Sequence, residues 1–141
     1  MPLGQEIGMH YWIIKSEPAA YGWDDLVRDG ATEWTGVKNA QASANLKAMA
    51  VGDQCLFYHS VTGLEAVGIA RVTRTAATDP TDPKWMSVEV SADRPLASPV
   101  TLKAMKADPR LAELAMVRQS RLSVSPVREA EWEAILAMSE G

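Results

Sequence analysis

The sequence predicts an α+β fold: a small, strongly curved and mostly antiparallel sheet or barrel with helices packed outside it. Strand-like segments follow one another between residues 54 and 90 without an intervening helix, which is typical of antiparallel pairing. Helix-like segments lie before and after this run instead of alternating with it. The length of 141 residues matches one domain with one substantial core.

The N-terminal third contributes one strand and two helices. Residues 10–15 are rich in aromatic and β-branched side chains and predict a strand, which Pro18 limits because the residue before a proline avoids helical geometry. A short helix is predicted over 23–29 and ends at Gly30. Residues 38–49 are rich in good helix formers, without glycine or proline, and predict a second helix.

The remaining elements are three longer strands and several short pieces. The strands are predicted over 54–60, 65–73 and 85–90, and the polar segment 78–84, which contains two prolines, forms a loop between the last two. Further along, the sequence predicts elements at these places: an extended piece over 99–102, a helical turn near 103–107, a strand over 121–124 and a helix over 128–138.

Charge, cysteine content and hydropathy exclude several classes of protein. A net charge of −4 and a pI near 5.2 argue against a protein that coats long nucleic acids through charge alone, but not against a reader of one nucleotide. Cys55 is the single cysteine, which excludes an internal disulfide and a multi-cysteine zinc site, and its apolar neighbours favour a buried thiol. No segment reaches the roughly 18 apolar residues that a membrane-spanning helix needs.

The first residues resemble no targeting signal. Residues 1–8 lack both a basic start and an apolar run, so we expect a loose leader and not a secretory signal. We expect a single domain over 9–141 and a cytoplasmic location.

No common catalytic motif is present. The sequence contains neither a phosphate-binding glycine loop nor the HExxH zinc motif. His59 and Ser60 are adjacent, but neighbours on a strand point to opposite faces, which argues against a serine hydrolase. The two histidines and the scattered carboxylates show no metal-ligand spacing, so we expect no metal and no cofactor.

Trp34 and the segment after it suit a planar heterocyclic ligand. Trp34 lies in a predicted loop beside amide side chains, where an indole offers a stacking face and amides read the edge of a base; packing in the core is the alternative. Lys38, Gln41 and Asn45 fall at the i, i+3, i+7 positions of one helix stripe. Asn39 lies near the helix start, where its amide either reads the base edge together with this stripe or caps the helix.

Two predicted strands end in polar side chains. Lys15, Ser16 and Glu17 lie at the end of the first strand, and Tyr58-His59-Ser60 ends the second. Strand ends are usual places for a binding site, and also for a turn.

At these residues the sequence resembles the EVE-domain family over nearly the whole chain, from about Met9 to Met138, and YTH domains more distantly. The motifs that carry the resemblance occur in order with compatible spacing: 11–18 (YWIIKSEP), 34–42 (WTGVKNAQA), 52–60 (GD and FYHS), 67–70 (VGIA), 83–85 (PKW) and 122–127 (LSVSPV). The chain departs from the commoner family pattern inside the helix motif, at Ala40, Ser43 and Ala44.

The resemblance implies a PUA-like fold, a curved antiparallel β-barrel with flanking helices. It also implies non-enzymatic binding of a modified base in DNA or RNA, with modified cytosine as the first choice and methylated adenine, the ligand of YTH relatives, as the second. The sequence leaves the oligomeric state open, with a monomer favoured. Carried over by position, the implied pocket residues are Lys15, Ser16, Trp34, Asn39, Tyr58, His59 and Ser60, with Glu17, Gln41 and Asn45 lining or bracing the pocket.

Cations in the middle of the chain are available for the flanking phosphates. Those that we expect to contact phosphate are Lys38, Arg71, Arg118 and Arg121, although each is also consistent with a solvated surface charge. Two other functions stay open. The acidic balance suits a binder of a free nucleobase or similar metabolite, and His59 with Glu17 offers an acid and a base for an enzyme acting on a nucleotide.

Overall fold

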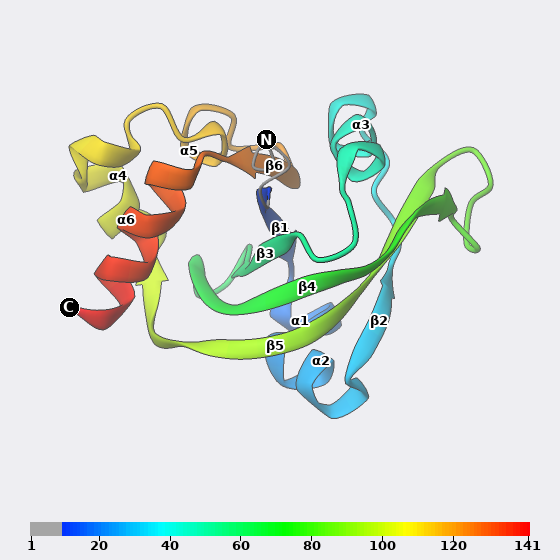
Figure 1. Ribbon diagram of the computed structural model, residues 1–141, viewed down its shortest axis with the longest axis horizontal. Helices are drawn as coiled ribbons and strands as arrows, with labels where there is room; N and C mark the ends of the chain where they lie inside the picture. Colours follow the sequence, from blue (N-terminus) through cyan, green and yellow to red (C-terminus); the bar gives the residue numbers. More distant parts are fainter. Residues whose placement is uncertain (1–9) are drawn as a thin grey trace, which may run out of the picture.

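One six-stranded sheet forms the frame of the molecule (Figure 1). The computed structural model describes residues 10–141, and the predicted leader over 1–8 lies outside the described residues. The strands are β1 (Tyr11–Ser16), β2 (Ala31–Trp34), β3 (Gln54–His59), β4 (Glu65–Thr78), β5 (Met86–Thr101) and β6 (Val124–Val127). Their order in the sheet is β2-β5-β4-β3-β1-β6.

Short helices connect and cover these strands. They are α1 (Pro18–Tyr21), α2 (Trp23–Asp29), α3 (Ala40–Ala48), α4 (Leu102–Ala107), the 3-10 helix η2 (Pro109–Leu111), α5 (Ala115–Arg118) and α6 (Glu129–Glu140). In Figure 1, α4, α5 and α6 lie at one end of the long β4–β5 ribbon, while α3 lies near its other end. No helix within residues 10–141 is long and apolar enough to cross a membrane.

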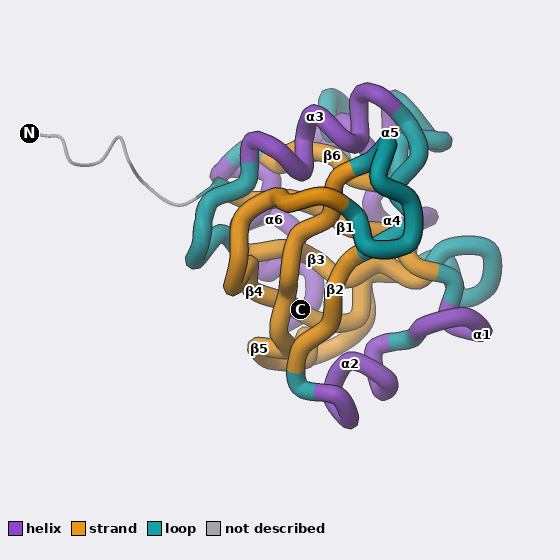
Figure 2. The backbone as a smooth tube through the Cα atoms, turned by 90° about the vertical axis from the view of Figure 1, so that its right-hand side faces the viewer, coloured by secondary structure: helices purple, strands orange, loops and turns teal. Residues whose placement is uncertain are grey.

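The sheet curves because its long strands contain irregularities. The pairing of β4 with β5 shifts register at several points, and β3 pairs with β4 through a further shift between Phe57 and Tyr58. Such bulges bend a strand and increase its twist. Figure 2 shows the strands curling around one another, so the predicted curved α+β fold is confirmed.

Strand alternation sends successive side chains into two hydrophobic clusters, one on each face of the sheet. On β1, Trp12 and Ile14 enter the cluster that α3 covers, whereas Ile13 enters the cluster that α6 covers. On β3, Phe57 likewise enters the cluster that α3 covers, and Tyr58 enters the cluster that α6 covers. Cys55 is buried, and this burial, together with the nearby charge of Asp53, raises the pKa of its thiol, as a structural cysteine requires.

Several boundaries differ from the predictions. The strand predicted over 121–124 starts at Val124 instead, and β5 continues to Thr101 through two prolines. β4 pairs along one side of β5, whereas β2 pairs along the other side only between Val88 and Ser91. The prolines of β5 lie beyond Ser91, where that other side has no partner strand, so they remove no ladder hydrogen bond on it. One strand pair is parallel: β1 and β3 lie side by side, joined through α1, α2, β2 and α3.

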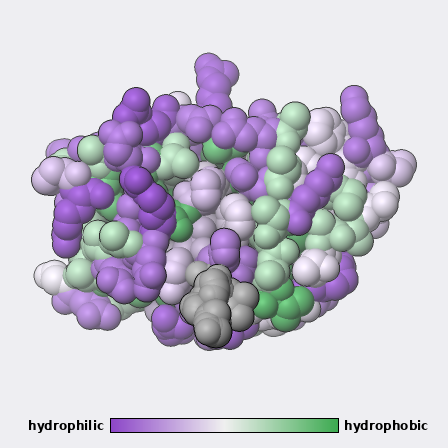
Figure 3. All heavy atoms as spheres, turned by 45° about the horizontal axis from the view of Figure 1, so that its top comes forward, coloured by the Kyte–Doolittle hydropathy of each residue, from purple (hydrophilic) through white to green (hydrophobic). Residues whose placement is uncertain are grey.

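Figure 3 shows a face on which hydrophilic and hydrophobic residues are interspersed. This mixture is ordinary for a solvated surface.

Candidate functional site

The parallel pairing of β1 with β3 brings the polar ends of both strands to one edge of the sheet. Lys15 lies opposite Tyr58 and Ser16 opposite His59, and the backbone N–H of Ser60 donates to the carbonyl of Ser16 at 2.9 Å. Parallel strands point their carboxyl ends the same way, which makes such an edge a common ligand site.

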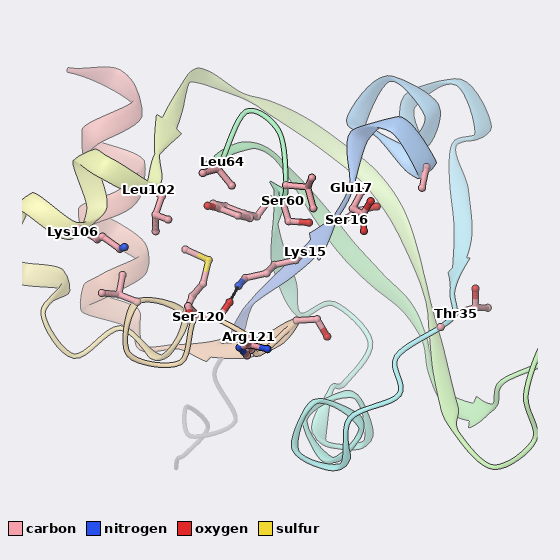
Figure 4. Close-up of a pocket in the computed structure, with 17 residues that line it drawn as sticks. Lys15, Ser16, Glu17, Thr35, Ser60, Leu64, Leu102, Lys106, Ser120 and Arg121 are labelled. Carbon is pink, nitrogen blue, oxygen red and sulfur yellow. Dashed lines mark hydrogen bonds between the residues drawn. The ribbon is translucent and has the colours of Figure 1, made fainter.

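A cavity of about 690 Å³ opens at this edge (Figure 4). The residues that line it are Lys15, Ser16, Glu17, Ala20, Thr35, Gly36, Tyr58, Ser60, Val61, Leu64, Leu102, Lys106, Met116, Val117, Ser120, Arg121 and Ser123. Its size falls in the range of about 300–1,000 Å³ that is usual for small-ligand pockets. The structure therefore brings together five of the ten predicted pocket residues: Lys15, Ser16, Glu17, Tyr58 and Ser60.

Lys15 lies in the middle of the cavity in Figure 4. Its Nζ donates a 2.7 Å hydrogen bond to the carbonyl of Ser120 and lies 5.9 Å from the centre of the Tyr58 ring. Partial burial lowers the pKa of Lys15, because a charged amine is poorly solvated there. Burial, followed by the charge of Glu65, raises the pKa of Tyr58, so its hydroxyl keeps its proton.

The hydroxyl groups around Lys15 differ in how they are already used. Ser16 Oγ donates to the carbonyl of Tyr21 at 2.6 Å, which holds α1 against the end of β1 and leaves the oxygen free to accept. Among the described residues, no partner is bonded to the Ser60 hydroxyl, which therefore retains both a donor and an acceptor for a ligand. The cavity thus offers polar groups at the paired ends of β1 and β3.

Trp34 occupies a different position from the predicted one. The expected loop is wrong: Trp34 ends strand β2, is only 7% exposed, and packs edge-to-face on Phe57 with ring centres 5.4 Å apart. It still borders a second cavity of about 270 Å³, which shares Thr35, Gly36 and part of β1 with the first. Packing covers most of the indole, so only a limited part of it can meet a ligand.

The polar stripe predicted on α3 does not form one surface. Asn39 caps the helix by accepting from the N–H of Ala42 at 2.9 Å, and Asn45 donates to the carbonyl of Val124 at 2.7 Å, which fastens α3 to β6. Asn39 and Gln41 border a third hollow of about 280 Å³, which shares Ser120 and Arg121 with the main cavity.

His59 faces away from the main cavity. Its Nε2 accepts a hydrogen bond from the backbone N–H of Trp23 at 3.1 Å. The ring also packs edge-to-face on Phe57, with centres 5.7 Å apart. His59 therefore fixes the start of α2, and its Nε2 is already occupied.

Most of the predicted phosphate contacts are neutralised by carboxylates. Arg71 pairs with Asp93 at 3.2 Å, and Arg118 pairs with Glu113 at 3.0 Å. Lys38 lies 3.6 Å from Asp82. Arg121 alone of the four borders the main cavity. Lys106 also lines the cavity, and it could not be predicted as a site residue because nothing in the helix sequence shows that α4 reaches this edge.

A buried carboxylate fixes the loop that links the two neighbouring cavities. Asp79 Oδ2 accepts from the N–H of Gly36 at 2.9 Å, and Oδ1 accepts from the N–H and the hydroxyl of Thr81 at 2.7 and 2.6 Å. Burial raises the pKa of Asp79, but these hydrogen bonds outweigh it and hold the pKa below its usual range. Gly36, which has φ +79°, is thereby held at the wall of both cavities.

The comparison with known proteins identifies the family. A family model of the EVE domain matches residues 10–138. The chain belongs to the EVE domain family. A solved structure from Agrobacterium tumefaciens resembles this EVE domain with a TM-score of 0.90 and 41% identity, over 92% of each chain. Mouse thymocyte nuclear protein 1 is 28% identical over an alignment of 167 positions, which spans 93% of this chain and 74% of the relative.

Two structures solved with nucleic acid share the fold. Human thymocyte nuclear protein 1 in complex with DNA containing 5-methylcytosine matches with a TM-score of 0.87 and 24% identity, over 94% of this chain and 98% of that one. A YTH domain from Zygosaccharomyces rouxii in complex with N6-methyladenosine RNA matches with a TM-score of 0.58 and 16% identity, over 94% of this chain and 87% of that one. The predicted PUA-like fold of this EVE domain is thus confirmed.

Within the part of the chain that the structure describes, no group of three or more histidine, cysteine or acidic residues is placed to hold a metal ion.

Proposed function

We propose that this EVE domain binds a modified base of DNA or RNA in the 690 Å³ cavity and catalyses no reaction on it. The observation that carries the proposal is the convergence of Lys15, Ser16, Tyr58 and Ser60 at the paired ends of β1 and β3. Within a nucleic acid, a base reaches such a cavity only after it leaves its stack. This extrusion costs a few kcal/mol, which the contacts inside the cavity must offset.

The cavity has a polar side that suits the hydrogen-bonding edge of a modified base and an apolar side that suits its methyl group. Hydroxyl and amine groups of Lys15, Ser16 and Ser60 are able to hydrogen-bond the polar edge of the base. The opposite side is formed by apolar side chains of α4 and α5, namely Leu102, Met116 and Val117. A methyl group on the base would lie against this apolar side and contribute roughly 0.8 kcal/mol.

The relatives indicate which bases to test first. One neighbour is solved with DNA that contains 5-methylcytosine and another with RNA that contains N6-methyladenosine. We therefore place 5-methylcytosine first and N6-methyladenine second. The occupied Nε2 of His59 and the exposed position of Glu17 at the mouth argue against an acid–base pair. These observations favour a binding protein over an enzyme.

Binding of short labelled single strands tests the proposal. Strands with one 5-methylcytosine, one N6-methyladenine or no modification are titrated at two salt concentrations, beside the free modified nucleosides. We expect one modified strand to bind more tightly than the unmodified strand. Equal, weak binding of every strand would overturn the proposal, and a nucleoside that binds as well as the strand would show a small-molecule binder instead.

A matched pair of variants locates the site. Lys15→Met removes the amine from the cavity while keeping a side chain of similar length. Lys47→Met makes the same change on α3, at a residue that borders none of the cavities described above. We expect Lys15→Met to weaken binding of the modified strand and Lys47→Met to leave its affinity unchanged. The reverse pattern would place the site elsewhere.

A further inference from the structure

The loop between β3 and β4 has an unusual backbone at the rim of the cavity. Val61 has φ +70° and Leu64 has φ +46°, and these are the non-glycine residues with positive φ in the described chain. The N–H of Thr62 donates to the carbonyl of Ser60 at 2.8 Å, so Val61 is the centre of the strained form of γ-turn. A β-branched residue rarely adopts such a φ, and strain of this kind gathers at functional positions.

Both ends of this loop are anchored. The N–H of Ser60 bonds to the carbonyl of Ser16 on β1, and the carbonyl of Leu64 accepts from the N–H of Leu102 at the start of α4, each at 2.9 Å. The backbone is thus held before any ligand arrives. Holding a loop in advance lowers the entropy lost on binding.

The two strained residues are also exposed apolar residues. Val61 is 69% exposed and Leu64 is 43% exposed, although both border the cavity. The other exposed large apolar residues of the described chain are Val27 at 54% and Val51 at 65%, and they line neither this cavity nor the three hollows that share residues with it. Among the large apolar side chains that line the cavity, the exposed ones therefore belong to this loop.

Cations without a carboxylate partner surround the same loop. Within residues 10–141, the cations that form no ion pair are Lys15, Lys47, Lys84, Lys103, Lys106 and Arg121. Three of these, Lys15, Lys106 and Arg121, line the cavity. Lys103 borders an adjoining hollow together with Leu64 and Lys106. Free positive charge beside exposed apolar side chains suits a partner that presents both phosphates and base faces.

We infer that Val61 and Leu64 form a wedge that enters the base stack of a duplex beside the extruded modified base, while Lys103 and Lys106 contact the flanking phosphates. The inference rests on the proposed function, and it adds that the ligand is approached within a duplex. Extrusion leaves a gap between base pairs, and apolar side chains inserted at such gaps keep the stack open. In Figure 4, Leu64 and Leu102 lie beside the cavity. The gap that an extruded base leaves in the duplex would lie next to these side chains.

The test compares two double variants on two forms of one ligand. Val61→Ser with Leu64→Ser removes the wedge, and Val27→Ser with Val51→Ser makes a similar change at exposed valines away from the cavity. Each is titrated with a 5-methylcytosine strand and with the duplex of that strand. We expect the wedge variant to lose about tenfold in duplex affinity, with single-strand affinity within about twofold of wild type. The control variant should match the wild type on both ligands.

Three results would overturn the inference. Duplex binding that is unchanged in the wedge variant would show that the loop plays no part in extrusion. Equal losses on strand and duplex would make the loop a wall of the cavity and not a wedge. Wild-type protein that binds modified and unmodified single strands equally would refute the proposed function itself, and the wedge with it. Thermal unfolding of both variants confirms that they are folded.

Discussion

Replacing Asp79 with alanine tests how the wall of the site is held. The change removes three hydrogen bonds, from the N–H of Gly36 and from the N–H and hydroxyl of Thr81. Losing the acceptor of a buried donor costs about 1–3 kcal/mol. Gly36 and Thr81 are themselves exposed, so water replaces part of what is lost. We expect the free energy of unfolding to fall by about 2 kcal/mol.

Asp82→Ala is the matched control, because it removes a carboxylate from the same loop. Asp82 makes one 3.2 Å hydrogen bond with the N–H of Lys84 and a 3.6 Å ion pair with Lys38, both near the surface. Its loss should cost no more than about 1 kcal/mol. Urea unfolding at pH 7 measures both variants. Equal stabilities for the two variants would refute the role given to Asp79.

The contribution of Asp79 also depends on pH. The folded-state pKa of Asp79 lies below its unfolded value of about 3.9, so its stabilising effect is complete above that pH. The effect is lost as the pH falls through the folded-state pKa. The difference in stability between wild type and Asp79→Ala should therefore be largest near pH 7 and shrink below about pH 4. A difference that grows on acidification would contradict the account.

Three further changes test the packing around the site. Gly68→Ala would place a Cβ 2.6 Å from the Trp23 ring and should cost about 1–3 kcal/mol in urea unfolding; an unchanged midpoint would show that the ring moves freely. Trp34→Ala should cost about 3–5 kcal/mol because the indole is buried, so Trp34→Phe is the variant for binding, where an unchanged affinity for a modified strand would remove Trp34 from the site. Asn45→Ala should lower stability by about 1 kcal/mol through the lost bond to β6, and a thermal midpoint equal to wild type would show that this bond contributes nothing.

The local chemistry of the site could be predicted from the sequence, but its assembly could not. The polar residues Lys15, Ser16 and Ser60 stand at strand ends that hydropathy and β-propensity reveal. That these ends meet depends on the parallel pairing of β1 with β3 across α1, α2, β2 and α3. Sequence periodicity indicates a strand, but it does not choose the partner of that strand.

Trp34 shows the same difficulty for a short element. The four residues of β2 are too few for a periodic pattern, so the sequence predicts a loop there. Pairing with β5 makes it a strand and buries the indole on Phe57. The ion pairs of Arg71 and Arg118 with Asp93 and Glu113 likewise depend on tertiary contacts, which is why the predicted phosphate contacts were only partly placed at the cavity.

Amide chemical shifts during a titration with modified and unmodified single strands measure most directly whether the cavity holds the modified base. The account predicts that the 5-methylcytosine or the N6-methyladenine strand shifts the amides of Lys15, Ser16, Ser60 and Ser123, and that the unmodified strand leaves these amides in place. Shifts concentrated around Arg71 and Asp93 instead, equal for all strands, would contradict it.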